Sequence, residues 1–239
     1  VVVAMTDPNP LVSGRGLAKL YAAGIEITHS VLKLEAEALN RGFIKRMQTG
    51  LPYVRLKIAS SLDGKTALLN GQSQWITGEA ARQDVHHWRA QSCAVLTGSG
   101  TIMADQPQLN VRHVSTTRQP RRLVLDRRRR LDPHIFPDFI IEQSQDDLKT
   151  ILMRLAKTQQ LNEIFVEAGA GLNAAFLEAN IIDELIIYFA PRILGHEARG
   201  LFALPPQHIL AQCPTCTFFE SKMIGNDIRL RARFAEISS

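Results

Sequence analysis

The chain contains 239 residues, of which 45% are hydrophobic and 21% are charged, proportions typical of a soluble globular protein with a sizeable core. No apolar run approaches the roughly 20 residues of a membrane-spanning helix, and three cysteines, an odd number, do not indicate a disulfide framework. We therefore expect a cytoplasmic protein with no membrane partner.

The net charge of +5 has two interpretations, namely nucleic-acid binding or a phosphorylated substrate with a phosphorylated cofactor. Much of the excess positive charge lies in one stretch with Arg121, Arg122 and four arginines at 127–130. Nucleic-acid binding favours aromatic residues among the basic ones, and this stretch has none, so we expect no nucleic-acid partner. The stretch is then either a solvated loop or a segment that faces phosphate.

Residues 1–50 are predicted to form a small α/β segment. Its expected elements are strands at 1–5 and 25–28 and helices at 17–23 and 30–47. The segment is too short to enclose a convincing core alone, and the chain does not begin with Met. We expect it to be the end of a domain that begins upstream, followed by a second domain at 51–239.

Strands and helices alternate along residues 51–239. Short apolar runs indicate strands, and apolar residues at helical spacing indicate helices. The predicted strands are 53–60, 94–97, 122–125, 164–167, 184–190 and an antiparallel pair, 218–221 with 227–233; the predicted helices are 78–90, 148–157 and 172–179. This alternation predicts an α/β sheet that helices cover on both faces.

A glycine turn follows the predicted strand 164–167. Residues 169–171, Gly-Ala-Gly, would begin a helix whose free N–H groups and positive dipole end suit a pyrophosphate. A Rossmann site also expects an acidic residue about 20 positions later, at the end of the next strand. Here Asp183 and Glu184 precede that strand instead, so the pattern favours a different nucleotide-binding fold.

Other candidate residues are ambiguous when taken singly. Glu167 ends a strand where α/β sheets bind ligands, but it could equally accept hydrogen bonds from the following turn. A strand lysine such as Lys57 usually points to solvent from an edge. Trp75 could be a core residue, and Arg89 could be a surface residue.

Several longer motifs occur in one order, and their combination is far more specific than any one of them. They are Lys-x-Ala-x-Ser-Leu-Asp-Gly from Lys57, Ser-x-Trp-Ile-Thr from Ser73, Thr-x-x-Ala-Asp-x-Pro-x-Leu-x-Val-Arg from Thr101, Val-Glu-Ala-Gly from Val166 and Ala-Pro-Arg-Ile-Leu-Gly from Ala190. From about Tyr53 onward the chain therefore resembles the reductase domain of the bifunctional riboflavin-biosynthesis deaminase–reductase. The resemblance is weakest at 118–150.

The resemblance implies an α/β fold with a dihydrofolate-reductase-like mixed sheet flanked by helices, preceded by a partial cytidine-deaminase-like α/β piece at 1–50. It also implies NADPH-dependent reduction of 5-amino-6-(5-phosphoribosylamino)uracil to the ribitylamino compound, by a homodimer or higher homo-oligomer. Zinc deaminases carry His-x-Glu and Pro-Cys-x-x-Cys, and neither motif occurs here. We expect zinc and deamination only in a domain upstream, and no metal in this chain.

The resemblance assigns site residues one by one. Lys57 matches the junction of cofactor and substrate, and our hypothesis is that Lys57 and Glu167 are the catalytic residues, which orient ribose hydroxyls and organise local charge. The implied NADPH contacts are Ala59, Trp75, Thr101, Asp105, Arg127 and the turn Gly169, Ala170, Gly171, Leu172, Asn173, Ala174 and Ala175. The implied substrate contacts are Ser73, Arg89, Leu109, Arg112 and Glu167. The two arginines suit a 5′-phosphate, because a guanidinium binds phosphate in bidentate fashion.

Arg127 departs from the family, which often has a small polar residue there, although an arginine could meet the cofactor's 2′-phosphate. Two other functions stay open. A different pteridine or dihydrofolate reductase could use the same fold, but the paired arginines and the deaminase-like segment argue against it. A basic nucleic-acid-binding module would show strongly salt-dependent binding and indifference to NADPH.

Overall fold

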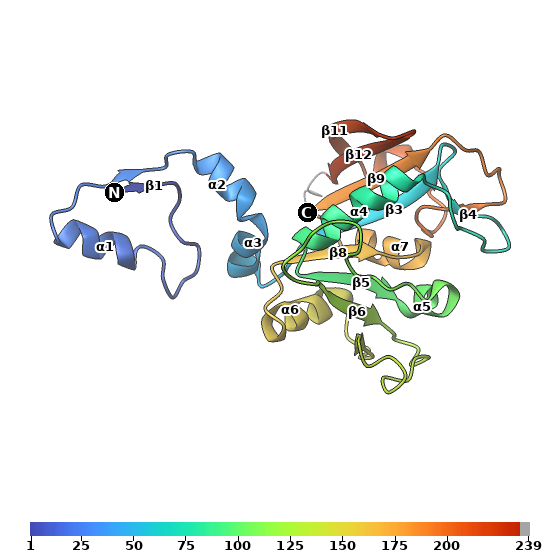
Figure 1. The fold of residues 1–239 in the computed structure, drawn as a ribbon, viewed down its shortest axis with the longest axis horizontal. Coiled ribbons are helices and arrows are strands. Elements are labelled where there is room, and N and C mark those ends of the chain that lie inside the picture. Colours follow the sequence, from blue (N-terminus) through green and yellow to red (C-terminus); the bar gives the residue numbers. More distant parts are fainter. Residues whose placement is uncertain (235–239) are drawn as a thin grey trace. The chain divides into compact units, whose positions relative to one another are not determined.

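The computed structural model describes residues 1–234, and the chain forms two compact units (Figure 1). The smaller unit comprises Val1–Tyr53 with Leu152–Glu163, and the larger comprises Val54–Ile151 with the chain from Ile164 onward. Within the part of the chain that is described, no helix combines the length and the apolar character needed to cross a membrane.

The smaller unit contains a short parallel strand pair and helices. Its elements are β1 (Val2–Val3), β2 (Thr28–His29), α1 (Arg15–Ala22), α2 (Lys33–Leu39), α3 (Arg41–Thr49) and most of α6 (Leu148–Thr158). The predicted continuous helix at 30–47 is wrong, because Asn40 separates α2 from α3. The Asn40 side chain donates to the carbonyl oxygen of Ala36 at 2.8 Å, a local bond of the kind that competes with helix continuation.

The larger unit is built on an eight-stranded mixed sheet in the order β11-β12-β9-β3-β8-β5-β6-β7. The strands are β3 (Tyr53–Ser61), β5 (Ala94–Gly98), β6 (Arg121–Leu125), β7 (Ile140–Glu142), β8 (Glu163–Glu167), β9 (Glu184–Ala190), β11 (Cys216–Ile224) and β12 (Asp227–Phe234). The predicted strands and the closing antiparallel pair are confirmed. Strand β7 and a separate pair, β4 (Lys65–Ala67) with β10 (Arg199–Gly200), were not predicted, because such short segments carry little periodicity.

The central strands are almost continuously apolar because they are buried on both faces, as parallel strands usually are. The remaining elements are α4 (Glu79–Gln91), α5 (Ser99–Asp105), α7 (Ala170–Glu178) and a 3₁₀ turn at Leu210–Gln212. Helix α4 lies across β8 and β9 (Figure 1). Its Val85 and Trp88 pack on Phe165 and Tyr188, which anchors the helix over the middle of the sheet.

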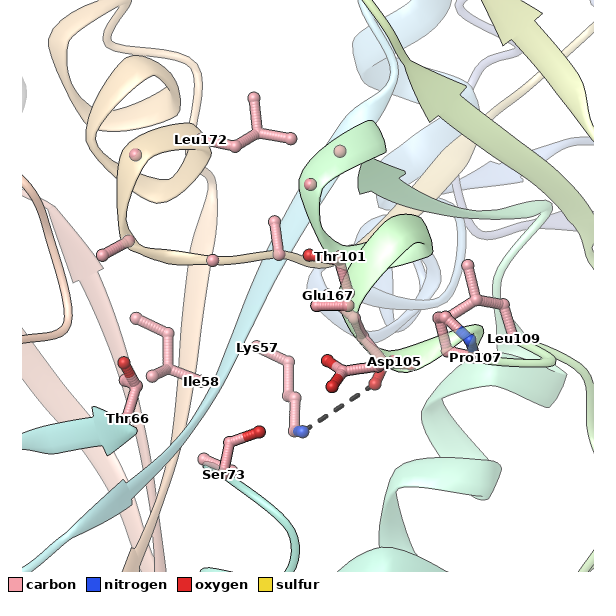
Figure 2. A pocket seen from close by; sticks show the side chains of 18 of the residues that line it. Lys57, Ile58, Thr66, Ser73, Thr101, Asp105, Pro107, Leu109, Glu167 and Leu172 are labelled. Carbon is pink, nitrogen blue, oxygen red and sulfur yellow. Dashed lines mark ion pairs between the residues drawn. The ribbon is translucent and has the colours of Figure 1, made fainter. Parts of the chain in front are cut away.

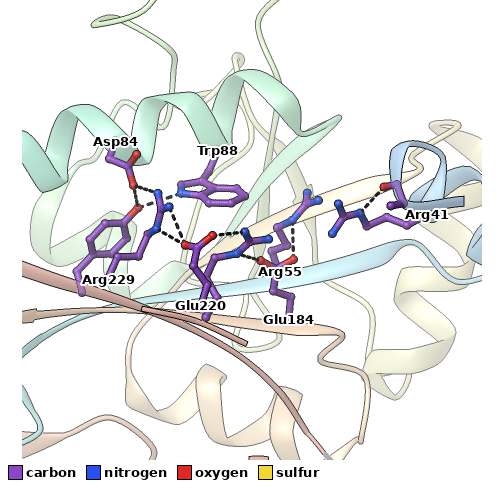
Figure 3. A network of polar contacts seen from close by, with 10 residues as sticks. Arg41, Arg55, Asp84, Trp88, Glu184, Glu220 and Arg229 are labelled. Carbon is purple, nitrogen blue, oxygen red and sulfur yellow. Dashed lines mark hydrogen bonds and ion pairs between the residues drawn. The ribbon is translucent and has the colours of Figure 1, made fainter. Parts of the chain in front are cut away.

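A chain of alternating charges crosses β12, β11, β9 and β3 (Figure 3). Arg229 binds Glu220 at 2.7 Å, and Arg231 binds Glu220 at 2.8 Å and Glu184 at 2.6 Å. Arg55 binds the second oxygen of Glu184 at 3.2 Å. Each carboxylate is therefore shared between two guanidinium groups, which compensates its removal from water.

The same network reaches α4 through Asp84 (Figure 3). Asp84 accepts from Arg229 at 2.5 Å and from the Tyr188 hydroxyl at 2.5 Å, and burial and the Asp84 carboxylate raise the pKa of Tyr188. Trp88 donates its indole N–H to the Tyr188 oxygen at 3.0 Å. The helix is thus bound to the sheet by polar contacts as well as by apolar packing.

We predict that Glu184→Gln destabilises the larger unit by about 1–3 kcal/mol, because the buried Arg55 and the half-buried Arg231 lose the charge of their shared carboxylate, although Arg231 keeps Glu220. Urea unfolding of both proteins measures the difference. Glu178→Gln removes an exposed carboxylate and is expected to change the free energy of unfolding by less than about 0.5 kcal/mol. Equal stability of the two variants would contradict a structural role for the network.

Candidate functional site

A cavity of about 1160 Å³ lies in the larger unit. Its walls come from the side chains of β3, the ends of β5, β6 and β8, the first turns of α5 and α7, and the inner face of α4. Open α/β sheets bind ligands at the carboxyl ends of their parallel strands, which is where Gly98, Leu125 and Glu167 lie. The position of the cavity is therefore the expected one for a ligand site.

The cavity gathers almost every predicted site residue. Those that line it are Lys57, Ala59, Ser73, Trp75, Arg89, Thr101, Asp105, Leu109, Arg112, Arg127, Glu167, Gly169, Ala170, Gly171, Leu172 and Ala175. Asn173 and Ala174 do not line it, because in α7 they point into the protein and are fully buried. The Asn173 amide instead donates to the carbonyl oxygen of Leu201 at 3.0 Å.

The positions of Lys57 and Trp75 in the structure decide between the alternative roles that the sequence left open for them. Lys57 lies in β3, a central strand, and its side chain is only 16% exposed, so it is not an edge lysine pointing to solvent. Trp75 is 61% exposed and is not a core residue. The guanidinium of Arg82 lies 4.8 Å from the centroid of the Trp75 ring. Arg82 and Trp75 both line the cavity.

Three charged residues meet at the centre of the cavity. Lys57 extends from β3 toward Glu167 at the end of β8 (Figure 2), with its Nζ 3.8 Å from Oε2. Arg89, from α4, donates Nε to Oε1 of Glu167 at 2.5 Å and Nη2 to Oε2 at 3.1 Å. The Glu167 carboxylate thus accepts two hydrogen bonds from the Arg89 guanidinium and also faces the Lys57 ammonium. These three residues are far apart in the sequence and meet only in the folded chain.

Burial and charge act in opposite directions on these groups. Burial lowers the pKa of Lys57, Glu167 raises it and Arg89 lowers it, with the net result below the ordinary value. Burial raises the pKa of Glu167, but Arg89 and Lys57 outweigh it and hold the pKa below its usual range. The site therefore holds an ionised carboxylate beside an ammonium that releases its proton more readily than a free lysine does.

The loop 106–113 forms a second wall next to Arg89. Arg89 donates Nη1 to the carbonyl oxygen of Asn110 at 2.9 Å, and Arg112 donates Nη1 to the side-chain oxygens of Gln108 and Asn110, both at 2.9 Å. Leu109 adopts a left-handed conformation with φ near 50°. Arg89 is thus largely engaged within the protein, whereas Arg112 is exposed in the cavity wall.

Two cavity residues, His86 and Arg199, were not predicted from the sequence, whereas Arg128 and Arg130 belong to the arginine stretch for which a phosphate-facing role was one alternative. His86 precedes Arg89 by three positions on α4, and residues three apart share one helix face, so this spacing was an available signal. Arg199 belongs to the overlooked short strand β10. No local pattern in the sequence indicates that Arg199 reaches the cavity.

The glycine turn fits a ligand that approaches the backbone closely. A Cβ atom built on Gly169 or Gly171 would meet no protein atom within 4 Å, yet both residues line the cavity. Packing within the protein therefore does not require glycine at these two positions. The turn leads into α7, whose first N–H groups and dipole favour an anion, so the residues present fit a pyrophosphate.

The arginine run lies at the β6 end of the cavity, where Arg127, Arg128 and Arg130 line the wall and Arg129 does not. Arg127 is held by Gln145 through a 3.2 Å bond to its carbonyl oxygen, and Arg130 donates to the Ser99 hydroxyl at 2.8 Å. The run is therefore partly ordered against the site rather than wholly a solvated loop. Among residues 1–234, no group of three His, Cys, Asp or Glu side chains is arranged to hold a metal ion.

A family model for the RibD C-terminal domain matches residues 52–230. The chain belongs to the RibD family. Riboflavin biosynthesis protein RibD of Escherichia coli K12 is 42% identical over 268 residues, which cover 96% of this chain and 73% of that protein. The resemblance inferred from the ordered motifs is thus confirmed.

Two solved structures of RibD-type proteins are similar along almost the whole chain. RibD of Acinetobacter baumannii is 44% identical with a TM-score of 0.91, covering 99% of this chain and 73% of that one. A diaminohydroxyphosphoribosylaminopyrimidine deaminase/5-amino-6-(5-phosphoribosylamino)uracil reductase from Thermotoga maritima is 29% identical with a TM-score of 0.87, covering 98% and 71%. These matches confirm the predicted α/β, dihydrofolate-reductase-like fold.

We predict that Glu167→Gln lowers the pKa of Lys57 further. Glu167 supplies the charge and hydrogen bond that raise this pKa, whereas burial and Arg89 both lower it, so removing the carboxylate charge leaves only the lowering effects. An NMR titration of the lysine side chains measures the shift. Asp105→Asn is the control, since Asp105 lines the cavity but is not among the groups acting on Lys57; an unchanged Lys57 pKa in Glu167→Gln would contradict the assigned coupling.

Proposed function

We propose that this chain is an NADPH-dependent reductase that converts 5-amino-6-(5-phosphoribosylamino)uracil to the ribitylamino compound in riboflavin biosynthesis. The observation that carries the proposal is the cavity. In a chain of the RibD family, it joins a Lys57–Glu167–Arg89 cluster, an arginine-rich wall and a glycine turn suited to pyrophosphate. The Thermotoga maritima relative, whose name includes this reductase activity, supports the choice of substrate.

The cofactor part of the proposal assigns the cavity on either side of the glycine turn to NADPH. The backbone of 169–172 would bind the pyrophosphate, and Ala59, Trp75, Thr101 and Asp105 would contact the rest of the molecule. Arg127 adds positive charge at the β6 end. When bound, the cofactor supplies a hydride to C1′ of the ring-opened, imine-like ribosylamine.

The substrate part of the proposal assigns distinct tasks to this chain's charged residues. Glu167, ionised between Arg89 and Lys57, accepts hydrogen bonds from ribose hydroxyls. Lys57 donates a hydrogen bond and, because its pKa is lowered, is suited to supply a proton. Arg112 offers a guanidinium to the phosphate, while Ser73 and Leu109 complete the wall. Fixing distance and orientation in this way lowers the barrier without further chemistry from the protein.

The proposal extends to the rest of the molecule. We assign 1–50 to the C-terminal part of a deaminase-like domain and 51–239 to the reductase domain, with zinc restricted to an upstream deaminase. We further assign the protein to the cytoplasm, as a homodimer or higher homo-oligomer. Gel filtration with light scattering tests the oligomeric state.

Turnover is measured by the loss of NADPH absorbance with 5-amino-6-(5-phosphoribosylamino)uracil as substrate. We expect NADPH oxidation that is much slower with NADH, and none with dihydrofolate in place of the pyrimidine. NADPH binding without turnover would reject the substrate assignment alone. If the folded protein bound no NADPH, the cofactor and the reductase assignment would both be wrong.

Lys57→Met is expected to lower kcat/KM by roughly 10²–10⁴-fold, because it removes the ammonium that faces Glu167. Glu167→Gln is expected to lower it as well, since the amide cannot hold Arg89 in an ionic bidentate bond. Steady-state rates at saturating NADPH measure both effects. Lys222→Met, an exposed lysine on β11, is the control, and full activity in both cavity variants would contradict the assigned roles.

Gly171→Val is expected to raise KM for NADPH about 10-fold or more, because its side chain would occupy space next to the turn that the protein leaves empty. Little effect on stability is expected, since the added Cβ has no non-neighbouring protein atom within 4 Å. Thermal unfolding together with NADPH titration separates the two effects. Loss of stability without loss of cofactor affinity would show that the glycine serves packing.

A further inference from the structure

We propose that His86 is a further substrate-binding residue, whose Nε2–H group donates a hydrogen bond to the phosphate of the phosphorylated pyrimidine. The proposal rests on the proposed function for the identity of that phosphate. His86 lies on the inner face of α4, lines the cavity and is one helical turn from Arg89. It lies outside the ordered sequence motifs that identify the family.

One hydrogen bond determines which ring nitrogen of His86 carries the proton. The backbone N–H of Arg112 donates to Nδ1 at 3.1 Å, so Nδ1 must be the unprotonated acceptor. In a neutral imidazole the proton then lies on Nε2. The same bond places His86 directly against the backbone of Arg112, the exposed arginine of the cavity wall.

The Nε2 atom is available to a ligand. His86 is only 3% exposed, and Arg112 is the hydrogen-bond partner that the described residues provide for it. Within the described residues Nε2 has no hydrogen-bond partner, yet it keeps some solvent-accessible surface. Since His86 lines the cavity, a ligand in the cavity can reach Nε2 through that accessible surface.

Burial and the neighbouring charges lower the pKa of His86 and so favour the neutral ring that carries this donor. Burial, Arg89, His113 and Arg112 lower the pKa of His86, Glu167 raises it, and the result is about 4. The ring of His113 meets His86 edge-on at 4.6 Å between centroids. A neutral donor adds no further positive charge to a cavity whose wall already contains more cationic than carboxylate side chains.

Arg89 uses most of its N–H groups for hydrogen bonds within the protein, so a bound phosphate depends on other donors. Nε and Nη2 of Arg89 bind Glu167, and Nη1 binds Asn110. Much of its hydrogen-bonding capacity is therefore committed to holding the site together. A phosphate next to Arg112 has several acceptor oxygens to satisfy, and the Nε2–H of His86 lies in the same cavity wall.

The test compares His86→Asn, His86→Gln and the control His87→Asn, which alters the exposed neighbouring histidine. Asparagine keeps an oxygen near the Nδ1 position for the Arg112 N–H but has no group at Nε2, whereas the longer glutamine amide reaches toward Nε2. Each variant is assayed with the phosphorylated pyrimidine and with its dephosphorylated analogue. Rates are recorded as a function of both the pyrimidine and the NADPH concentration.

We expect His86→Asn to lower kcat/KM for the phosphorylated substrate about 10-fold, which corresponds to about 1.4 kcal/mol, mainly through KM. The dephosphorylated analogue and KM for NADPH should be unaffected, and His86→Gln should recover part of the loss. An equal loss with both pyrimidines would show a purely structural role and overturn the proposal. No loss with either pyrimidine, or a rise confined to KM for NADPH, would overturn it as well.

A binding measurement separates this proposal from the proposed function. Ribose 5-phosphate should raise the thermal unfolding midpoint of the wild-type chain and of His87→Asn but not of His86→Asn. That result in a chain without reductase activity would reject the proposed reaction and retain the phosphate contact. The same rise in His86→Asn as in the wild type, or no rise in any of the three, would overturn the contact.

Discussion

The site depends on the carboxylate of Glu167. It is the point at which β8, α4 and β3 meet, through Arg89 at 2.5 Å and Lys57 at 3.8 Å. A buried carboxylate without partners would lose several kcal/mol of solvation, and two cations compensate that loss only when the geometry is good. Because Arg89 also holds Asn110, this one ion-pair cluster positions the loop that carries Leu109 and Arg112.

The charge network that includes Asp84 and the charged cavity wall both contact α4, but they differ in how their charges are paired. The chain from Asp84 through Arg229, Glu220, Arg231 and Glu184 to Arg55 pairs its charges internally, so it stabilises the sheet and offers little to a ligand. The cavity is different, because its wall contains more cationic than carboxylate side chains. Anionic ligands complement that imbalance, which agrees with a phosphorylated substrate and a phosphorylated cofactor.

The order of elements was predictable because it depends on short-range patterns. Continuous apolar runs identified the central strands, and the glycine turn after 164–167 identified the start of a helix. The failures also have local causes. Asn40 breaks the expected helix through its own side chain, and strands of two or three residues, such as β10, are too short for periodicity to reveal.

The sequence by itself determined the alternation of strands and helices, the glycine turn and the ordered motifs that identify the family, because these depend on residues close together in the chain. Only the tertiary structure decided which side chains meet. Arg89 and Glu167 are 78 positions apart, and their pairing exists because α4 packs across β8. The central position of Lys57 follows from strand order, and the protonated nitrogen of His86 follows from a contact with Arg112, 26 positions away. Such pairings arise from packing between distant segments, for which local propensity carries no signal.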